Sequence, residues 1–215
     1  MSMSSKRALE GIDLYCLTGE EYSRGRSNVD VVRAMLEAGV GLVQYREKDK
    51  KAGEKLRECR AIRELTRAAG ATFIVNDDVA IAVLVDADGV HIGQEDLPVP
   101  EVRRLLGPGK IIGLSTHAPA EATAAVEAGA DYIGVGPIYA TKTKKDVCDP
   151  VGLEYLDWVV ANTDIPFVAI GGIKEYNIAE VVRHGASCAA MITEIVGAEN
   201  IAERVDSLRT AMRKG

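Results

Sequence analysis

Short apolar runs recur along the chain, and several of them begin just after a glycine that ends a helix-like segment. The segment 63–69 is followed by Gly70 and then by the run 72–75, and Gly39 and Gly185 precede similar runs. Glycine is a common residue just past a helix, because it enters the left-handed backbone region without a Cβ penalty. A strand at that point is typical of a parallel βαβ repeat.

The repeat predicts eight strands separated by helices. The strands are expected at 14–17, 42–45, 72–75, 89–92, 111–114, 132–135, 167–170 and 189–192. The helices are expected near 28–38, 52–69, 78–84, 98–106, 118–128, 152–161, 175–184 and 198–213. Strands that are continuous apolar runs belong to a sheet buried on both faces. We therefore predict an α/β protein, a single (β/α)8 TIM barrel over residues 1–215, with a short N-terminal extension at about 1–10 that need not be ordered.

An open doubly wound sheet is the alternative arrangement of such repeats. It normally carries a GxGxxG motif after its first strand, where the backbone receives a dinucleotide phosphate. Here the first expected strand is followed by Thr18-Gly19-Glu20-Glu21, which lacks that pattern. The barrel is therefore favoured.

The composition is that of a globular protein with an acidic surface. Hydrophobic residues make up 47% and charged residues 27%, which excludes a disordered chain. The formal net charge of −6 disfavours nucleic acids and anionic membranes as partners, and 5% aromatic residues are few for base stacking. We expect small-molecule substrates, and an anionic one must meet a local concentration of cations. The composition leaves a homo-oligomer open.

The cysteine pattern and the lengths of the apolar runs indicate a cytoplasmic protein. Cys16, Cys59, Cys148 and Cys188 form no CxxC pair and no zinc-binding cluster, so we expect reduced thiols. Residues 1–9 lack the apolar core of a signal peptide. No segment approaches the ~20 apolar residues that a membrane helix needs.

The residues just after each expected strand carry the candidate chemistry, since a TIM barrel gathers its active site at the carboxyl ends of its strands. After the second strand, the period of two directs Gln44, Arg46 and Lys48 to one side. Two cations and an amide at a barrel mouth suit a phosphate or diphosphate, which arginine chelates with two N–H groups. Taken alone, a charge run of this kind is more often a solvated loop.

Carboxylates follow the next two expected strands. Asn76, Asp77 and Asp78 come after the third strand, and Asp96 comes after the fourth. Two carboxylates, together with waters and phosphate oxygens, form a usual magnesium shell, so Asp77 and Asp96 are candidate Mg2+ ligands. Either Asp77 or Asp78 would also serve well as the N-cap of the helix that follows.

Other polar residues near the mouth have structural alternatives. Ser115, after the fifth strand, suits a phosphate oxygen and the cap of the next helix equally well. We expect His91 in or beside its strand as a core histidine and Gln94 as a structural residue. His117 is not assigned as a base, because the sequence offers no Ser/His/Asp arrangement.

The last strands offer hydroxyl and backbone donors. The loop after the sixth strand is longer than a turn needs and carries Thr141, Thr143 and Lys144, which is typical of a binding loop or lid. Gly171 and Gly172, after the seventh strand, let backbone N–H groups approach a phosphate. The mouth thus offers a charged anion site and a backbone anion site, which predicts an enzyme that joins a diphosphate substrate to a phosphate substrate.

From about residue 14 to residue 202 the chain resembles the thiamine phosphate synthase family, and the most specific motif is QYREK at 44–48. It is followed in order by Asn76-Asp77, Gly93-Gln94-Glu95-Asp96, Ser115, Gly136-Pro137, Thr141-Lys142-Thr143-Lys144 and Gly171-Gly172-Ile173. The resemblance implies that 4-amino-2-methyl-5-hydroxymethylpyrimidine diphosphate is condensed with 4-methyl-5-(2-hydroxyethyl)thiazole phosphate. The products would be thiamine phosphate and diphosphate, formed by a dissociative substitution that Mg2+ assists.

The resemblance also implies the roles of the site residues, position by position. The pyrimidine diphosphate would be held by Gln44, Arg46, Lys48, Asn76, Ser115 and Lys144, of which Arg46, Lys48 and Lys144 would be catalytic. The thiazole phosphate would be held by Thr141, Thr143, one of Gly171 or Gly172, Ile192 and Thr193. Asp77 and Asp96 would hold Mg2+.

The chain departs from the family at the end of the eighth strand. Val-Ser-Ala-Ile is usual there, and this chain has Ile192-Thr193-Glu194-Ile195. Thr193 keeps the hydroxyl, and strand alternation is expected to point Glu194 away from it. The alternatives for function are a thiazole tautomerase-like barrel, an isomerase or epimerase of sugar phosphates, and a non-catalytic thiamine phosphate-binding protein. None of these needs both the QYREK cations and the metal carboxylates.

Overall fold

The computed structural model describes residues 9–141, 143 and 148–215. The strands are β1 Leu14–Leu17, β2 Leu42–Tyr45, β3 Thr72–Asn76, β4 Gly89–Ile92, β5 Ile111–Thr116, β6 Tyr132–Val135, β7 Phe167–Ile170 and β8 Ala189–Met191. The helices are α1 Asn28–Glu37, α2 Ala52–Ala69, α3 Val79–Leu84, α4 Val99–Leu106, α5 Pro119–Glu127, α6 Gly152–Asn162, α7 Ile178–Arg183, α8 Thr193–Val196 and α9 Ile201–Met212, with a 3-10 turn η2 at Glu20–Tyr22.

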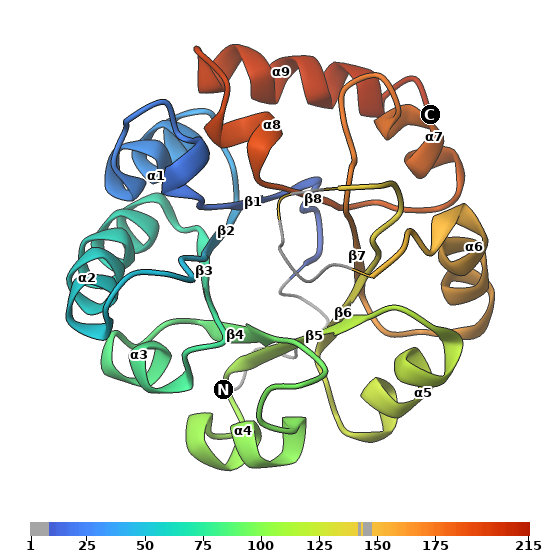
Figure 1. Cartoon of the computed structure of the whole chain (residues 1–215), viewed down its shortest axis with the longest axis horizontal. Helices are drawn as coiled ribbons and strands as arrows, with labels where there is room; N and C mark the ends of the chain where they lie inside the picture. The colour runs from blue at the N-terminus through green and yellow to red at the C-terminus, as the bar shows by residue number, and fades with distance from the viewer. Residues whose placement is uncertain (1–8, 142, 144–147) are drawn as a thin grey trace.

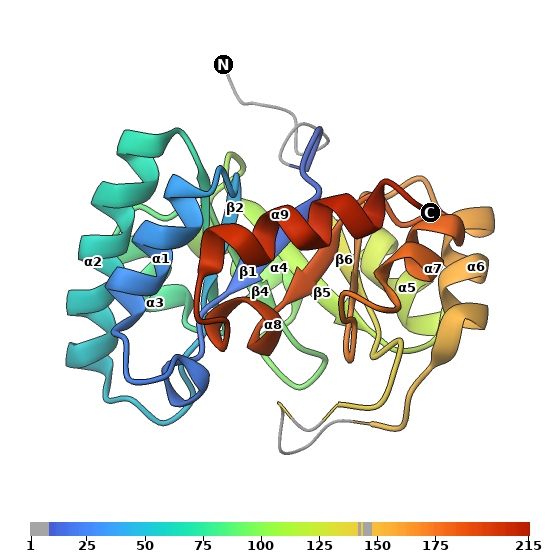
Figure 2. The same cartoon turned by 90° about the horizontal axis from the view of Figure 1, so that it is seen from above.

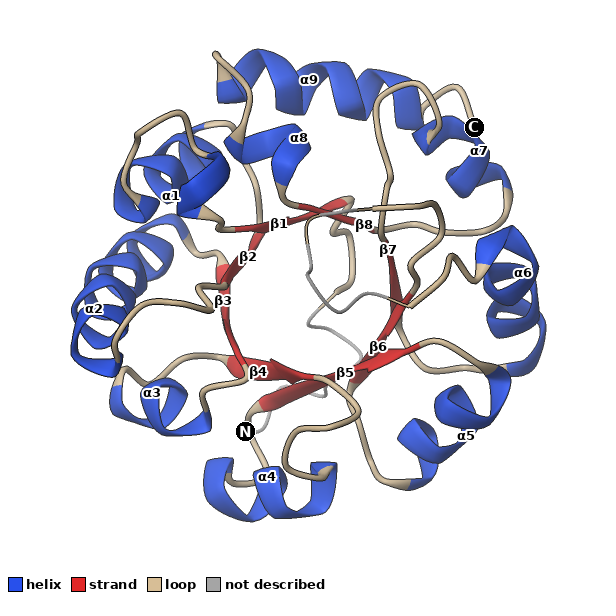
Figure 3. Cartoon of the chain, in the orientation of Figure 1, coloured by secondary structure: helices blue, strands red, loops and turns tan. Residues whose placement is uncertain are grey.

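The strands form a closed parallel barrel in chain order, and the helices surround it (Figures 1 and 3). Each strand pairs with its neighbours in the sequence, and β1 closes the ring against β8 with Tyr15 opposite Ala190. The predicted TIM barrel is confirmed. The N-terminal extension predicted at about residues 1–10 lies largely outside the described residues, and the single domain stays a prediction.

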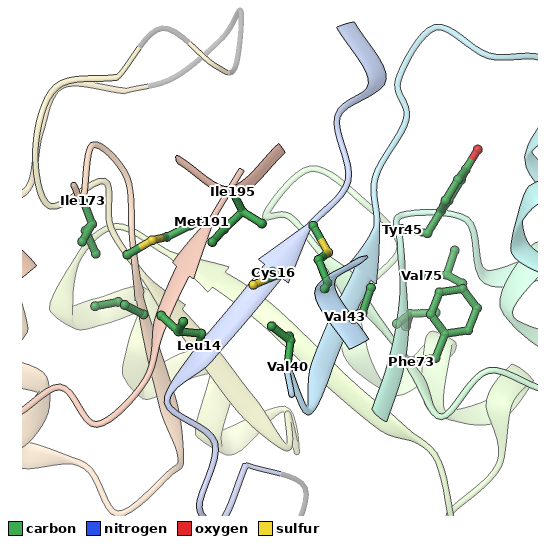
Figure 4. Close-up of a cluster of buried hydrophobic side chains, with 14 of the residues drawn as sticks. Leu14, Cys16, Val40, Val43, Tyr45, Phe73, Val75, Ile173, Met191 and Ile195 are labelled. Atoms are coloured by element: carbon green, nitrogen blue, oxygen red, sulfur yellow. The ribbon is translucent and has the colours of Figure 1, made fainter. Parts of the chain in front are cut away.

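Alternate residues of each strand face two different apolar layers. Leu14 and Cys16 of β1 belong to the larger layer, where strands pack against helices (Figure 4). Tyr15 and Leu17 belong to the smaller cluster, which fills the barrel interior. Both faces of β1 are therefore buried, as its continuous apolar sequence predicts.

The loops that follow β4 and β6 project from the same side of the barrel, the lower side in Figure 2. This side carries the carboxyl ends of the strands.

All four cysteines are free, and burial raises the pKa of the Cys16 thiol to about 12. Within the described part of the chain, no helix has both the length and the apolarity to cross a membrane.

Several predicted element boundaries differ from the structure by a few residues, and one of these differences bears on the site. The eighth strand ends at Met191, one residue earlier than predicted, and the short helix α8 begins at Thr193. Ile192, with φ −112° and ψ −81°, is the residue where the backbone leaves the extended conformation. Strand alternation therefore does not apply to Thr193 and Glu194.

Candidate active site

A cavity of about 840 Å³ opens at the carboxyl ends of the strands. That volume lies within the range of small-molecule binding sites. The described residues that the sequence assigned to substrates or metal all line it: Gln44, Arg46, Lys48, Asn76, Asp77, Asp96, Ser115, Thr141, Thr143, Gly171, Gly172, Ile192 and Thr193. The remaining assigned residue, Lys144, lies outside the described residues.

The three inward-facing residues after β2 lie along one wall of the cavity. Gln44 is buried within the strand, and Arg46 and Lys48 follow it at intervals of two residues. Thr18 fixes the backbone of Arg46, because its hydroxyl accepts from the Arg46 N–H at 2.8 Å and lies 3.2 Å from the Arg46 carbonyl oxygen. This geometry confirms the predicted alternation and favours the cavity over a solvated loop.

The residues between them point the other way and are anchored outside the barrel. The Tyr45 hydroxyl donates to Glu58 of α2 at 2.7 Å, and the Glu47 carboxylate accepts from the backbone N–H of Glu20 at 2.9 Å. Lys50 joins the same cluster through ion pairs with Glu20 and Glu58. The outward half of the QYREK segment thus holds the inward half in place.

The sequence left two positions open for the aspartates after β3, one in the site and one at the cap of the next helix, and the structure gives one position to each. Asp78 caps α3, since its Oδ1 accepts from the Ile81 N–H at 3.1 Å. Asp77 has φ +59°, an uncommon value for a residue with a Cβ, and its carboxylate pairs with the Lys48 ammonium in the cavity. Asp78 is therefore structural, and Asp77 belongs to the site.

Asp96 brings a second carboxylate to the same corner. Its Oδ2 accepts from the Gly93 N–H at 2.7 Å. Burial raises the pKa of Asp96, and the neighbouring Asp77 carboxylate raises it further. Two carboxylates that repel each other favour a cation between them, and oxygen ligands suit Mg2+. Among the described residues no cluster of three or more His, Cys, Asp or Glu side chains could hold a metal, so water and substrate oxygens would complete the shell.

A chain of hydrogen bonds crosses the barrel interior beneath the cavity. Gln44 Nε2 donates to the Tyr15 hydroxyl at 2.7 Å, and that hydroxyl lies 3.0 Å from the Tyr132 hydroxyl. The Tyr132 hydroxyl lies 2.9 Å from His91 Nδ1, and His91 Nε2 lies 2.9 Å from Ser115 Oγ. Burial raises the pKa of both tyrosines, so both stay as neutral hydroxyls. The chain links Gln44 and Ser115, the two side chains at its ends that were predicted to hold the pyrimidine diphosphate.

Sequence reasoning missed most of this chain. Tyr15 and Tyr132 were unassigned, although the alternation of β1 and β6 places both in the interior. His91 lies within β4 as expected, but its ring also lines the cavity. Ser115 is not a helix cap, because the N-cap of α5 is Ala118 without a side-chain bond.

The opposite wall of the cavity is built from backbone. Gly171 and Gly172 have φ +98° and +65°, and both residues line the cavity. A Cβ on Gly171 would lie 2.4 Å from Pro137 Cβ, and one on Gly172 would lie 2.7 Å from the Ala140 carbonyl oxygen. No hydrogen bond within the described chain uses the N–H of either glycine. These N–H groups are therefore available to an anion.

The loop after β6 faces these glycines with hydroxyls. Thr141 and Thr143 are held to each other, with the Thr143 N–H donating to Thr141 Oγ1 at 3.3 Å and the two hydroxyl oxygens 3.2 Å apart. The Tyr22 hydroxyl, from the loop after β1, donates to the Thr143 carbonyl oxygen at 3.5 Å. This part of the loop is therefore joined to the loop that follows β1.

Glu194 does not point away from the site, contrary to the expectation from strand alternation. Because α8 begins at Thr193, both Thr193 and Glu194 line the cavity. Lys174 Nζ donates to Thr193 Oγ1 at 3.2 Å and to Glu194 Oε1 at 3.0 Å. Sequence reasoning gave Lys174 no role, and its position two residues beyond Gly172 is the signal that was available.

The fold and the site define a class of protein: a TIM-barrel enzyme whose single cavity has one wall of charged side chains and one wall of backbone and hydroxyl groups. Comparison with known proteins identifies the family. The family model described as thiamine monophosphate synthase matches residues 14–195. The chain therefore belongs to the thiamine monophosphate synthase family and, with it, to the transferases of thiamine biosynthesis.

Individual relatives agree with the family model. A thiamine-phosphate synthase of Pelotomaculum thermopropionicum is 61% identical over 99% of both chains. One of Lawsonia intracellularis is 58% identical over 93% of this chain and 92% of its own length. A solved structure, thiamine phosphate pyrophosphorylase from Pyrococcus furiosus, superposes with a TM-score of 0.86 at 35% identity, covering 94% of this chain and 96% of that one.

Proposed function

We propose that the chain condenses the aminopyrimidine diphosphate with the thiazole phosphate to give thiamine phosphate and diphosphate, by a dissociative substitution assisted by Mg2+. The observation that carries this proposal is the pair of anion-binding walls on one cavity. Arg46, Lys48 and two carboxylates line one wall, and Gly171-Gly172 with threonine hydroxyls lines the other. A reaction between a diphosphate and a phosphate requires both.

The pyrimidine ring is proposed to lie against Gln44 and Ser115. Gln44 Oε1 is buried and has no hydrogen-bond partner among the described residues. A buried acceptor without a partner costs about 1–3 kcal/mol, so a ligand donor at this point is stabilised. The exocyclic amine of the pyrimidine supplies such a donor. Tyr15 fixes the other end of the Gln44 amide, so its oxygen faces the ligand in one orientation.

The diphosphate is proposed to lie between Arg46, Lys48 and the Asp77–Asp96 corner. The bond between the pyrimidine methylene carbon and the diphosphate oxygen breaks, and diphosphate leaves with the electron pair. Arg46 and Lys48 stabilise the negative charge that develops on it. Asp77 and Asp96 would hold Mg2+, which would supply further neutralisation of the leaving diphosphate. Lys144 is proposed to contribute a third cation.

The thiazole phosphate is proposed to lie on the opposite wall, with its phosphate on the Gly171 and Gly172 N–H groups and on Thr141, Thr143 and Thr193. This position aims the ring nitrogen across the cavity at the pyrimidine methylene. The nitrogen lone pair forms the new C–N bond, and no proton is transferred. The protein therefore needs no general base, and its contribution is orientation and charge stabilisation.

The test is product formation by the purified chain given both substrates. We expect thiamine phosphate and diphosphate in equal amounts, with no product when either substrate is omitted or EDTA is present. Arg46→Ala should lower kcat/KM by about 100-fold or more, while Arg104→Ala, on the exposed face of α4, should leave it unchanged. Binding of the thiazole phosphate without any release of diphosphate would contradict the synthase and favour the tautomerase-like or binding-protein alternative.

A further inference from the structure

We propose that Lys174 is the cationic contact of the phosphate group at the glycine wall, and that Thr193 and Glu194 hold its ammonium in position. This inference rests on the proposed function, because the phosphate in question is that of the thiazole substrate. It assigns a binding role to Lys174 and a positioning role to Glu194, which stands where the family usually has a small residue.

The first argument is charge. Among the described residues that line the cavity, the lysines and arginines are Arg46, Lys48 and Lys174. Arg46 and Lys48 both follow β2, and Lys48 is paired with Asp77. In the described part of the glycine wall, Lys174 is therefore the one such cation. A phosphate dianion bound by backbone and hydroxyl groups gains substantially from a charge-assisted hydrogen bond.

The second argument is geometry. Lys174 follows Gly171-Gly172-Ile173, so its backbone leaves the same turn whose residues line the cavity. Its ammonium lies 3.2 Å from the hydroxyl oxygen of Thr193 and 3.0 Å from the carboxylate of Glu194. An ammonium has three donors, and these contacts use two of them. A phosphate oxygen that accepts from Thr193 would lie within reach of the third.

The third argument is the neutralisation of Glu194. A carboxylate that lines a phosphate site repels the ligand unless its charge is balanced. Lys174 contacts one carboxylate oxygen, and Arg204 Nη1 lies 3.8 Å from the other. Arg204 is itself paired with Glu175. Glu194, with 19% of its side chain exposed, is therefore held between two cations, and it orients Lys174.

The test is a double-mutant cycle on Lys174 and Glu194, read from the two Michaelis constants. Lys174→Met keeps the aliphatic stem and removes the charge. We expect it to raise KM for the thiazole phosphate by about 30-fold. The variant removes the cation at the phosphate and leaves the Glu194 carboxylate without its lysine partner. The value of kcat and the KM for the pyrimidine diphosphate should change by less than about twofold.

The other two corners of the cycle distinguish binding from a merely structural ion pair. Glu194→Ala should raise the same KM by about threefold or less, and the double variant by about 15-fold, so removing Lys174 still costs about fivefold when Glu194 is absent, as a direct contact with the phosphate requires. Lys174→Arg should restore most of the affinity. Lys110→Met removes an ion-paired lysine away from the cavity and should leave both constants unchanged.

Calorimetric binding of the thiazole phosphate and of the unphosphorylated thiazole alcohol separates the two proposals. We expect Lys174→Met to weaken binding of the phosphate and to leave the alcohol unaffected. A wild-type chain that forms product while Lys174→Met keeps the wild-type KM would overturn this inference alone. A wild-type chain that forms no product but binds the phosphate in a Lys174-dependent way would overturn the proposed function alone. Failure of the wild type to bind the phosphate would overturn both.

Discussion

The two walls of the cavity, each proposed to bind an anion, are built by different means. At β2 to β4 the preparation is in side chains: Arg46 and Lys48 face the cavity because Tyr45 and Glu47 are anchored on the outside. After β7 the preparation is in the backbone, where Gly171 and Gly172 take positive φ values against the loop that follows β6. The first wall should therefore be sensitive to charge, and the second to the addition of a single methyl group.

The largest effect is expected from Asp77 on the side-chain wall, and its neighbour Asp78 is the matched control. Asp77→Asn keeps a residue that tolerates φ +59° but removes a carboxylate from the proposed Mg2+ site, and we expect kcat/KM to fall by about 100-fold. Asp78→Ala removes the cap of α3 and should cost about 1 kcal/mol of unfolding free energy with full turnover. Steady-state assays across Mg2+ concentrations measure kcat/KM, and urea unfolding measures the free energy of unfolding. Equal turnover in the two variants would contradict the division of roles.

The next effect is expected from a methyl group on the backbone wall. Gly171→Ala places a Cβ 2.4 Å from Pro137 Cβ at φ +98°, and we expect KM for the thiazole phosphate to rise about tenfold with a loss of about 1–3 kcal/mol in stability. The matched control is Gly70→Ala, at φ +67°, where a Cβ meets no atom within 4 Å. It should cost about 1 kcal/mol and leave KM unchanged. If both variants raise KM for the thiazole phosphate alike, the increase reflects lower stability of the fold and not a change at the glycine wall.

The smallest effect is expected from the hydrogen-bond chain that runs from Gln44 to Ser115 beneath the cavity. Tyr132→Phe removes the hydroxyl shared by Tyr15 and His91, and we expect KM for the pyrimidine diphosphate to rise about threefold with a loss of about 1–2 kcal/mol. Tyr155→Phe removes a hydroxyl bonded to Thr116, outside the cavity, and should lower stability by a similar amount without a change in KM. An unchanged KM in Tyr132→Phe would show that the chain only stabilises the fold.

The fold could be predicted because each repeat has characteristic residue types at the end of its helix and in the strand that follows. Gly39, Gly70, Gly129 and Gly185 all take positive φ at the ends of helices, and each precedes a buried strand. The side-chain wall was predictable for the same reason, since charged residues at strand ends stand out and the period of two gives their direction.

The rest of the site depends on backbone geometry that residue types do not reveal. Glu194 was placed wrongly because the chain turns from strand to helix at Ile192, which changes the direction of every later side chain. Lys174 was overlooked because its partner Thr193 is distant in sequence and becomes a neighbour only when β7 and β8 pair. Tyr15 was overlooked because a tyrosine in an apolar run is usually a core residue. Here its ring lies in the core and its hydroxyl accepts a hydrogen bond from Gln44, a residue of the cavity. The role of Lys144 stays a prediction.

The central claim is that two anions occupy two separate walls of one cavity. The most direct measurement is a calorimetric titration of thiazole phosphate into the protein, with Mg2+ present, without and with saturating diphosphate. Separate walls predict one site per chain and an affinity for thiazole phosphate that changes by less than about threefold, since the diphosphate binds elsewhere. An apparent Kd that rises in proportion to the diphosphate concentration would mean that the two anions compete for one site, and it would contradict the account.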